Sequence, residues 1–166
     1  MRIASLEALG VPSPLLSVWE KAFGPELLPI QTEAVTKFGL FTGQNLLVQA
    51  PTSAGKTFIG EMAAARCALA GQRVLYLAPT RALAEEKHAH FQELYGRLGL
   101  RVLISTRDRR EDDHRFTRGD FALAVAVPEK VRALWARTNG TFRGLGLVVI
   151  DELQMLADPQ RGACLE

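Results

Sequence analysis

The chain has 166 residues, of which 48% are hydrophobic and 23% are charged. This length and apolar content are enough for one domain with its own buried core, and they exclude a disordered or collagen-like chain. The net charge of +2 is too small to indicate nucleic-acid binding by itself. The longest apolar run, residues 121–127, is far shorter than the roughly 18 residues that a membrane-spanning helix needs.

Neither the N-terminus nor the cysteines indicate export or metal binding. Residues 1–7 lack the apolar stretch of a secretory signal, so we expect an intracellular, cytoplasmic protein, and association with the nucleoid stays open. Cys67 and Cys164 have no CxxC or Cys/His spacing, which argues against a disulfide framework or a zinc site.

Five short apolar runs alternate with helix-like stretches, which predicts a mostly parallel sheet covered by helices. The runs are almost continuously apolar, as is typical of strands buried on both faces. They are residues 45–49, 73–78, 101–105, 121–127 and 147–151. The sequence therefore predicts the α/β class.

Helix start and stop signals lie before and between these runs. Pro, Ser and Thr mark the predicted starts, and Gly marks most of the ends. The expected helices cover residues 13–23, 29–38, 56–70, 80–98 and 128–139. Residues 107–118 mix five Arg with four acidic residues, and we expect a solvated loop or helix there.

The turn between the first run and the third helix has the features of a phosphate-binding loop. A helix N-terminus offers backbone N–H donors and a favourable dipole to phosphate, Lys56 adds a positive charge, and the Thr57 hydroxyl can ligate Mg²⁺. Ala50 replaces the Gly of the general pattern, so a chance Gly-Lys-Thr is the alternative. The predicted ATP contacts in the loop are Thr52, Ser53, Ala54, Gly55, Lys56 and Thr57.

A second element of a nucleotide site ends the last apolar run. Asp151 follows that run directly and can hold Mg²⁺, while Glu152 can orient and deprotonate an attacking water. The alternative is that Asp151 and Glu152 are ordinary solvated residues at a strand end, with no catalytic role. Together, the loop and the acidic pair predict hydrolysis of a nucleoside triphosphate, with Lys56, Asp151 and Glu152 as the catalytic residues.

These elements resemble the first RecA-like motor domain of a superfamily 2 DEAD/DExH-box helicase, in its Ski-like branch. Residues 50–57 resemble motif I, which in that superfamily tolerates Ala at the first position, and residues 151–154 resemble motif II. Residues 28–31 resemble the Q motif, which implies that Gln31 reads the adenine edge. The resemblance implies ATP and Mg²⁺ as cofactors and single-stranded or partly duplex DNA or RNA as the partner.

Three further segments resemble nucleic-acid-binding motifs of the family: residues 78–87, residues 105–108 and residues 128–130. Each follows a predicted strand, at the edge where parallel sheets bind ligands. Helix capping is the alternative role of Thr106 and Pro128, and an ion pair with Glu85 is the alternative role of Arg81. The contacts that the resemblance implies are Pro79, Thr80, Arg81, Thr106, Pro128, Glu129 and Lys130.

Two residues depart from the family pattern. Arg107 stands where the family usually has Gly, and it either blocks the approach of nucleic acid or adds a phosphate contact. Gln154 replaces the His of the DExH motif; it can hydrogen-bond but cannot titrate, so its coupling of motif II to later motifs is expected to differ.

The resemblance also predicts the organisation of the chain. Residues 1–26 are expected to be a helical lead-in, and residues 27–166 a first RecA-like domain that is incomplete at its C-terminus. Motif III and the second RecA-like domain with its arginine fingers are missing. We therefore expect a piece of a larger helicase, with low stability and little ATP hydrolysis of its own.

Two other functions are the alternatives. The first is an ATP- or nucleic-acid-binding module without turnover. The second is a small P-loop kinase, which would leave Gln31 and residues 78–87 unexplained.

Overall fold

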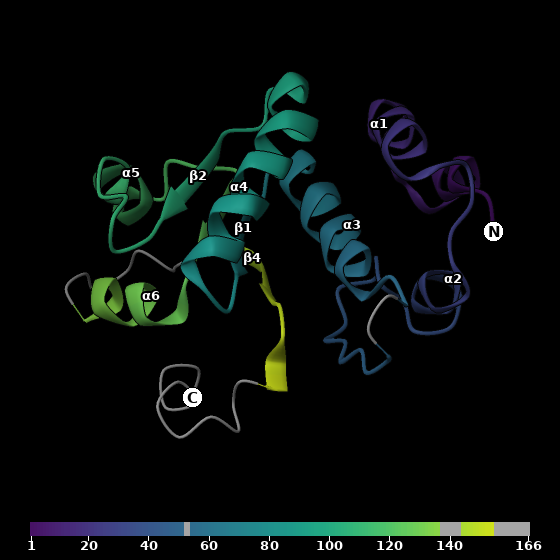
Figure 1. Ribbon diagram of the computed structural model, residues 1–166. Coiled ribbons are helices and arrows are strands. Elements are labelled where there is room, and N and C mark those ends of the chain that lie inside the picture. Colours follow the sequence, from purple (N-terminus) through teal and green to yellow (C-terminus); the bar gives the residue numbers. More distant parts are fainter. Residues whose placement is uncertain (52–53, 137–143, 155–166) are drawn as a thin grey trace. The chain divides into compact units, whose positions relative to one another are not determined.

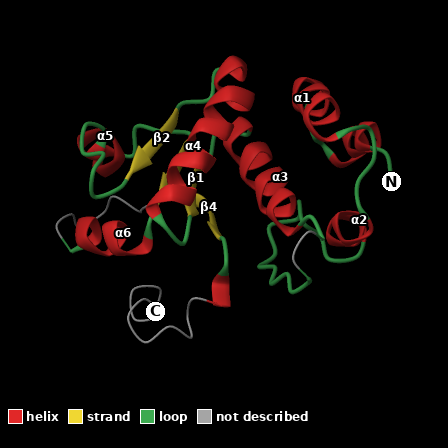
Figure 2. Cartoon of the chain, in the orientation of Figure 1, coloured by secondary structure: helices red, strands yellow, loops and turns green. Residues whose placement is uncertain are grey.

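The computed structural model describes residues 1–51, 54–136 and 144–154. It divides into two compact units, Met1–Arg66 and Cys67–Glu166. Helices make up the regular structure of the first unit, and the second contains a sheet with helices (Figures 1 and 2). None of the described helices is long and apolar enough to cross a membrane.

The first unit contains a 3₁₀ helix, η1 (Ile3–Leu9), and the helices α1 (Ser13–Phe23) and α2 (Pro29–Thr36), followed by most of α3 (Lys56–Leu69). Its core is built around Trp19, which is fully buried and meets Phe58 of α3 edge to face, with ring centroids 5.6 Å apart. The three helices agree with the sequence-based prediction, whereas η1 was not predicted.

The predicted strand over residues 45–49 is wrong. Residues 45–51 adopt neither helix nor strand, and the Leu47 side chain is 74% exposed. A strand persists only when its backbone groups pair with a neighbour. No ladder among the described residues includes this segment, so its apolar composition alone does not make it a strand.

The second unit is built on a four-stranded sheet in the order β2-β3-β1-β4. All neighbouring strands are parallel, and the register places Leu75 of β1 beside Ala124 of β3 and Val148 of β4. The strands are β1 (Arg73–Leu77), β2 (Val102–Ser105), β3 (Leu123–Ala126) and β4 (Leu145–Ile150). These strands confirm the other four predicted runs and the α/β class.

Two helices of this unit begin at the residues that signalled their starts. Thr80 caps the N-terminus of α4 (Arg81–Tyr95) by accepting a hydrogen bond from the backbone N–H of Leu83. Pro128 is the first residue of α6 (Pro128–Trp135), and residues 137–139 of the predicted helix lie outside the described residues. The 3₁₀ helix η2 (Gly96–Leu98) extends α4, and the charged segment is a loop followed by α5 (Asp113–Arg118).

The two faces of the sheet have separate apolar layers. On one face, Tyr76 of β1 meets Phe91 of α4, with ring centroids 5.2 Å apart. On the other face, a cluster joins side chains of the strands to Phe116 of α5 and Leu134 of α6. Side chains that alternate along β1 thus enter opposite layers, which explains its continuously apolar sequence.

Strand β4 lies at one edge of the described sheet and pairs only with β1, as β2 lies at the other edge and pairs only with β3. Side-chain exposure alternates along β4, and Val148 and Ile150 are 46% and 39% exposed. The prediction that this run is buried on both faces is therefore wrong within the described structure, although its position as a parallel strand is right.

Candidate functional site

In the loop before α3, the side chain of Lys56 binds the backbone of the residues that begin the loop. The Lys56 Nζ donates hydrogen bonds to the carbonyl oxygens of Ala50, at 2.6 Å, and Pro51, at 2.8 Å. A phosphate oxygen is a stronger acceptor for an ammonium group than a neutral carbonyl. The arrangement therefore holds the lysine in the loop, with acceptors that an incoming phosphate can replace. Thr52 and Ser53 lie outside the described residues.

Gly55 has a conformation that other residues rarely adopt. Its φ is 88°, and a Cβ atom there would lie 2.4 Å from Gln31 Nε2 and 2.7 Å from Leu28 Cδ1. The backbone angle thus favours glycine, and a Cβ would force the ends of the Gln31 and Leu28 side chains to move. Thr57, the second residue of α3, is exposed, as a hydroxyl that ligates a metal ion needs to be.

Gln31 connects α2 to this loop. Its side chain is only 5% exposed; Nε2 donates to the carbonyl oxygen of Gly55 at 3.1 Å, and Oε1 accepts from the backbone N–H of Leu28 at 2.8 Å. An amide side chain has a second N–H and a second lone pair. Contact with adenine, which stays a prediction, would have to use these remaining groups.

The predicted acidic pair follows β4. The backbone N–H of Asp151 donates to the carbonyl oxygen of Leu77, 3.0 Å away, which extends the pairing with β1. The hydroxyl of Tyr76, which is almost fully buried, donates to Asp151 Oδ2 at 2.9 Å. The sequence analysis did not predict a role for Tyr76. The feature that could have revealed it is a polar hydroxyl group within an otherwise apolar run.

Glu152 stands out by its backbone. Its φ is 56°, the one positive value among the described non-glycine residues. Such a conformation costs roughly 1–3 kcal/mol and concentrates at functional sites. The side-chain amide of Gln154 donates a hydrogen bond to the Glu152 carboxylate. The structure therefore fixes the direction of the predicted general base.

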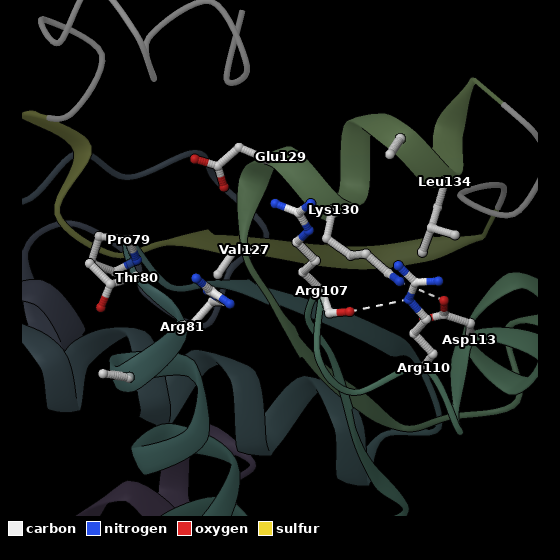
Figure 3. Close-up of a pocket in the computed structure, with 12 residues that line it drawn as sticks. Pro79, Thr80, Arg81, Arg107, Arg110, Asp113, Val127, Glu129, Lys130 and Leu134 are labelled. Atoms are coloured by element: carbon white, nitrogen blue, oxygen red, sulfur yellow. Dashed lines mark hydrogen bonds and ion pairs between the residues drawn. The ribbon is translucent and has the colours of Figure 1, made fainter.

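A pocket of about 900 Å³ opens beyond the carboxyl ends of β1, β2 and β3 (Figure 3). It brings together three of the segments predicted to bind nucleic acid. The lining residues are Pro79, Thr80, Arg81, Ala82, Arg107, Arg110, Asp113, Val127, Glu129, Lys130, Ala133 and Leu134. Four of them are cations and two are carboxylates, so the lining carries a net positive charge that suits an anionic ligand.

Two of the predicted nucleic-acid contacts do not line the pocket. Thr106 is 1% exposed, and its hydroxyl accepts a hydrogen bond from the backbone N–H of Arg109 at 3.3 Å. Pro128 is buried at the first position of α6. These are the capping and turn roles that the sequence left open for both residues.

Carboxylates pair with several cations around the pocket. Arg81 pairs with Asp108 rather than with Glu85, the partner considered from the sequence. Glu85 pairs with Arg109, with 3.1 Å between Nη2 and Oε2. These two ion pairs tie the loop after β2 to the first turns of α4.

A third ion pair lies deeper. Lys130 Nζ is 2.5 Å from Asp113 Oδ2, and the hydroxyl of Ser105 donates to Asp113 Oδ1 at 2.9 Å. Asp113 thus links β2, α5 and α6 through both of its carboxylate oxygens. The described residues contain no group of three or more His, Cys, Asp or Glu side chains that could hold a metal ion.

Residues 28–166 match the family model for DEAD/DEAH box helicases. The chain belongs to this family. It is 39% identical, over 142 residues, to the ATP-dependent DNA helicase Hel308 of Pyrococcus abyssi, and this match covers 85% of the chain and 19% of that helicase. It is 36% identical over 171 residues to the enzyme of the same name from Methanocella arvoryzae, of which it covers 22%. The chain thus spans about a fifth of the length of these relatives.

The fold agrees with the family. A crystal structure described as a hypothetical ATP-dependent RNA helicase from Sulfolobus tokodaii matches with a TM-score of 0.71 at 19% sequence identity. The match covers 92% of this chain and 44% of that chain. The sequence-based prediction of a RecA-like helicase domain is thereby confirmed. Membership of the DEAD/DEAH box family argues against the alternative, a small P-loop kinase.

Proposed function

We propose that this chain is the ATP-binding motor domain of an ATP-dependent nucleic-acid helicase or translocase, which hydrolyses ATP with Mg²⁺ in the intact parent protein. The observation that carries the proposal is the loop before α3, where Gly55 has a positive φ against Gln31 and Lys56 is held by two exchangeable carbonyl groups. These polar groups lie at a helix N-terminus, where backbone N–H groups and the helix dipole favour phosphate.

The proposed nucleotide site uses residues of both sequence motifs. Lys56 binds the phosphates together with the backbone of residues 52–57, and Gln31 contacts the base. Thr57 and Asp151 offer a hydroxyl and a carboxylate, the hard oxygen ligands that Mg²⁺ prefers. When bound, Mg²⁺ neutralises charge on the transferred phosphoryl group.

Glu152 acts as the general base in this proposal. It orients the attacking water and accepts its proton on a carboxylate oxygen. The hydrogen bond from Gln154 and the strained backbone of Glu152 support a fixed carboxylate. In the proposal Gln154 also couples motif II to later motifs; the hydrogen bond that it donates in the described residues stays within motif II.

The pocket beyond the sheet is the proposed path of the nucleic-acid strand. It lies at the carboxyl ends of parallel strands, where α/β folds bind ligands, and its lining is cationic. The names of the relatives favour DNA over RNA. We propose that the backbone of the strand passes along the three segments that contain Pro79, Thr80, Arg81, Thr106, Pro128, Glu129 and Lys130.

Hydrolysis and binding can be separated in the intact parent protein. We expect Glu152→Gln to bind ATP as the wild type does and to hydrolyse it at least a hundredfold more slowly, because only the base is removed. Calorimetry and a phosphate-release assay measure the two steps. Loss of ATP binding would show that the roles of the two acids are misassigned. Absence of hydrolysis in the wild-type parent would favour the alternative, a binding module without turnover.

A further inference from the structure

Four cations line the strand-end pocket, and they fall into two kinds. Arg81 pairs with Asp108, and Lys130 pairs with Asp113. Arg107 and Arg110 line the same pocket and are exposed, yet neither has a carboxylate partner within the described part of the chain. The four cations are therefore not equally available to an anionic ligand.

Lys130 is the least available of them. Its side chain is 12% exposed and that of Asp113 is 25% exposed. Both Asp113 oxygens are already in use, one with Lys130 and the other with the hydroxyl of Ser105. Moving the ammonium group to a phosphate would leave a largely buried carboxylate without its cation, which is strongly unfavourable. Lys130 therefore serves to hold α6 against α5 and β2.

Arg107 and Arg110 belong to the loop after β2, and the two residues between them hold this loop in place. Asp108 pairs with Arg81, and Arg109 donates to both carboxylate oxygens of Glu85, at 3.3 and 3.1 Å. These contacts fix the loop to α4. The side chains of Arg107 and Arg110 lie among the residues that line the pocket, as that of Lys130 does (Figure 3).

The two arginines are also connected to each other. Arg110 Nε donates to the carbonyl oxygen of Arg107 at 3.2 Å. This bond orients the Arg110 guanidinium and leaves its two terminal nitrogens for a ligand. A guanidinium group with two such donors matches the oxygens of a phosphate in a bidentate manner.

We infer that Arg107 and Arg110 are the residues that grip the phosphate backbone of a single strand in this pocket, and that Lys130 is a positioning residue that does not touch it. The inference rests on the proposed function, since it assigns phosphate contacts within the proposed strand path. It adds Arg110, to which no role had been given, and it decides the role of Arg107 in favour of a contact.

The salt dependence of strand binding tests the inference in the 166-residue chain. For single strands, the log–log slope of affinity against salt changes by roughly 0.7 for each phosphate neutralised. With a fluorescent oligothymidylate, we expect R107Q/R110Q to make the slope shallower by about 1.4, and each single variant by about 0.7. The control R97Q removes one exposed cation beyond the far end of α4 and is expected to leave the slope unchanged.

The double variant D113N/K130Q removes the buried ion pair without changing the net charge. We expect its slope to equal that of the wild type, and a thermal melt checks that it folds. A shallower slope for folded D113N/K130Q together with a wild-type slope for R107Q/R110Q would overturn the inference. A wild-type chain that binds no oligonucleotide at all would contradict the proposed function instead.

Inorganic pyrophosphate separates a nucleic-acid path from a site for free phosphates. We expect it not to displace the oligonucleotide at concentrations tenfold above those at which the oligonucleotide saturates the chain. Displacement at equal concentrations, abolished by R107Q/R110Q, would assign the two arginines to a free anion and overturn the nucleic-acid assignment.

Discussion

The loop before α3 and the strand-end pocket are both proposed to bind phosphates, but different contacts hold them in place. In the loop, backbone carbonyl groups bind Lys56, and a glutamine side chain packs on Gly55. In the pocket, side chains pair with side chains across β2, α4, α5 and α6. A local motif thus specifies most of the first site, to which Gln31 is added from α2, whereas the second depends entirely on how distant segments meet.

Gly55→Ala is expected to have the largest effect on the loop. An alanine costs about 1–2 kcal/mol at a positive φ, and its Cβ would also overlap Gln31 and Leu28. We expect ATP affinity, measured by calorimetry, to fall at least tenfold, because the loop must rearrange.

Gly24→Ala is the matched control for this variant. Gly24 has the same φ of 88°, but nothing lies within 4 Å of its added Cβ. We expect the free energy of unfolding of this variant to fall only by the cost of placing alanine at a positive φ, and its ATP affinity to stay unchanged. Equal effects of both substitutions on ATP affinity would mean that the contact between Gln31 and Gly55 does not shape the loop.

Asp108→Asn is expected to have a smaller effect, on the pocket. Arg81 and Asp108 are exposed on 56% and 68% of their side chains, so their ion pair stabilises the chain by at most about 1 kcal/mol. Releasing Arg81 adds one available cation. We expect a modest gain in affinity for a single strand and a salt slope steeper by about 0.7.

Asp120→Asn controls for the change in net charge. Asp120 pairs with Arg101, which precedes β2, so this ion pair lies at the amino edge of the sheet, opposite the pocket. Asp120→Asn releases Arg101, and it also removes one of the two carboxylates that pair with Arg115, whose other partner is Asp112. A gain as large for Asp120→Asn as for Asp108→Asn would show that strand binding follows net charge and not the pocket.

The smallest expected effect is on the pH dependence of Tm, and it concerns α4, the helix whose first residues line the pocket. Burial lowers the pKa of His88 on α4 below its usual value of 6.5, and the neighbouring Arg109 lowers it further. The unfolded chain therefore binds the proton first on acidification, so stability falls as the pH drops below about 6.5. We expect His88→Gln to reduce the loss of Tm between pH 7.5 and pH 5.5.

His114→Gln, at an exposed position on α5, is the comparison variant for this measurement. Comparing the two variants separates the removal of a half-buried imidazole on α4 from the removal of an exposed one on α5. If Tm falls as much in His88→Gln as in the wild type between pH 7.5 and pH 5.5, His88 does not contribute to the pH dependence.

The fold was predictable wherever one residue type determines a local structure. Thr80 and Pro128 mark the starts of α4 and α6, and the apolar runs mark β1, β2 and β3. Residues 45–49 show the limit, because a strand also needs a neighbour and composition does not reveal one. The same holds for the exposure of β4, since β2 also lies at an end of the strand order and is buried throughout.

The site was predictable to a similar extent. The Gly55-Lys56-Thr57 turn and the Asp151-Glu152 pair stand out in the sequence because each is continuous. The hydrogen bond between Tyr76 and Asp151 joins residues on adjacent strands. Asp113 was not predicted either, since the three elements that it links come together only in the folded chain.

Calorimetric titration of the 166-residue chain with MgATP, in the wild type and in Lys56→Ala, tests the account most directly. A charge-assisted contact of this kind contributes about 1.5–3 kcal/mol, so ATP affinity should fall by roughly tenfold to more than a hundredfold. The control is Lys37→Ala, which removes an exposed lysine paired with Glu33 on the same unit and should leave the affinity unchanged. Equal affinity in wild type and Lys56→Ala would contradict the phosphate-loop assignment.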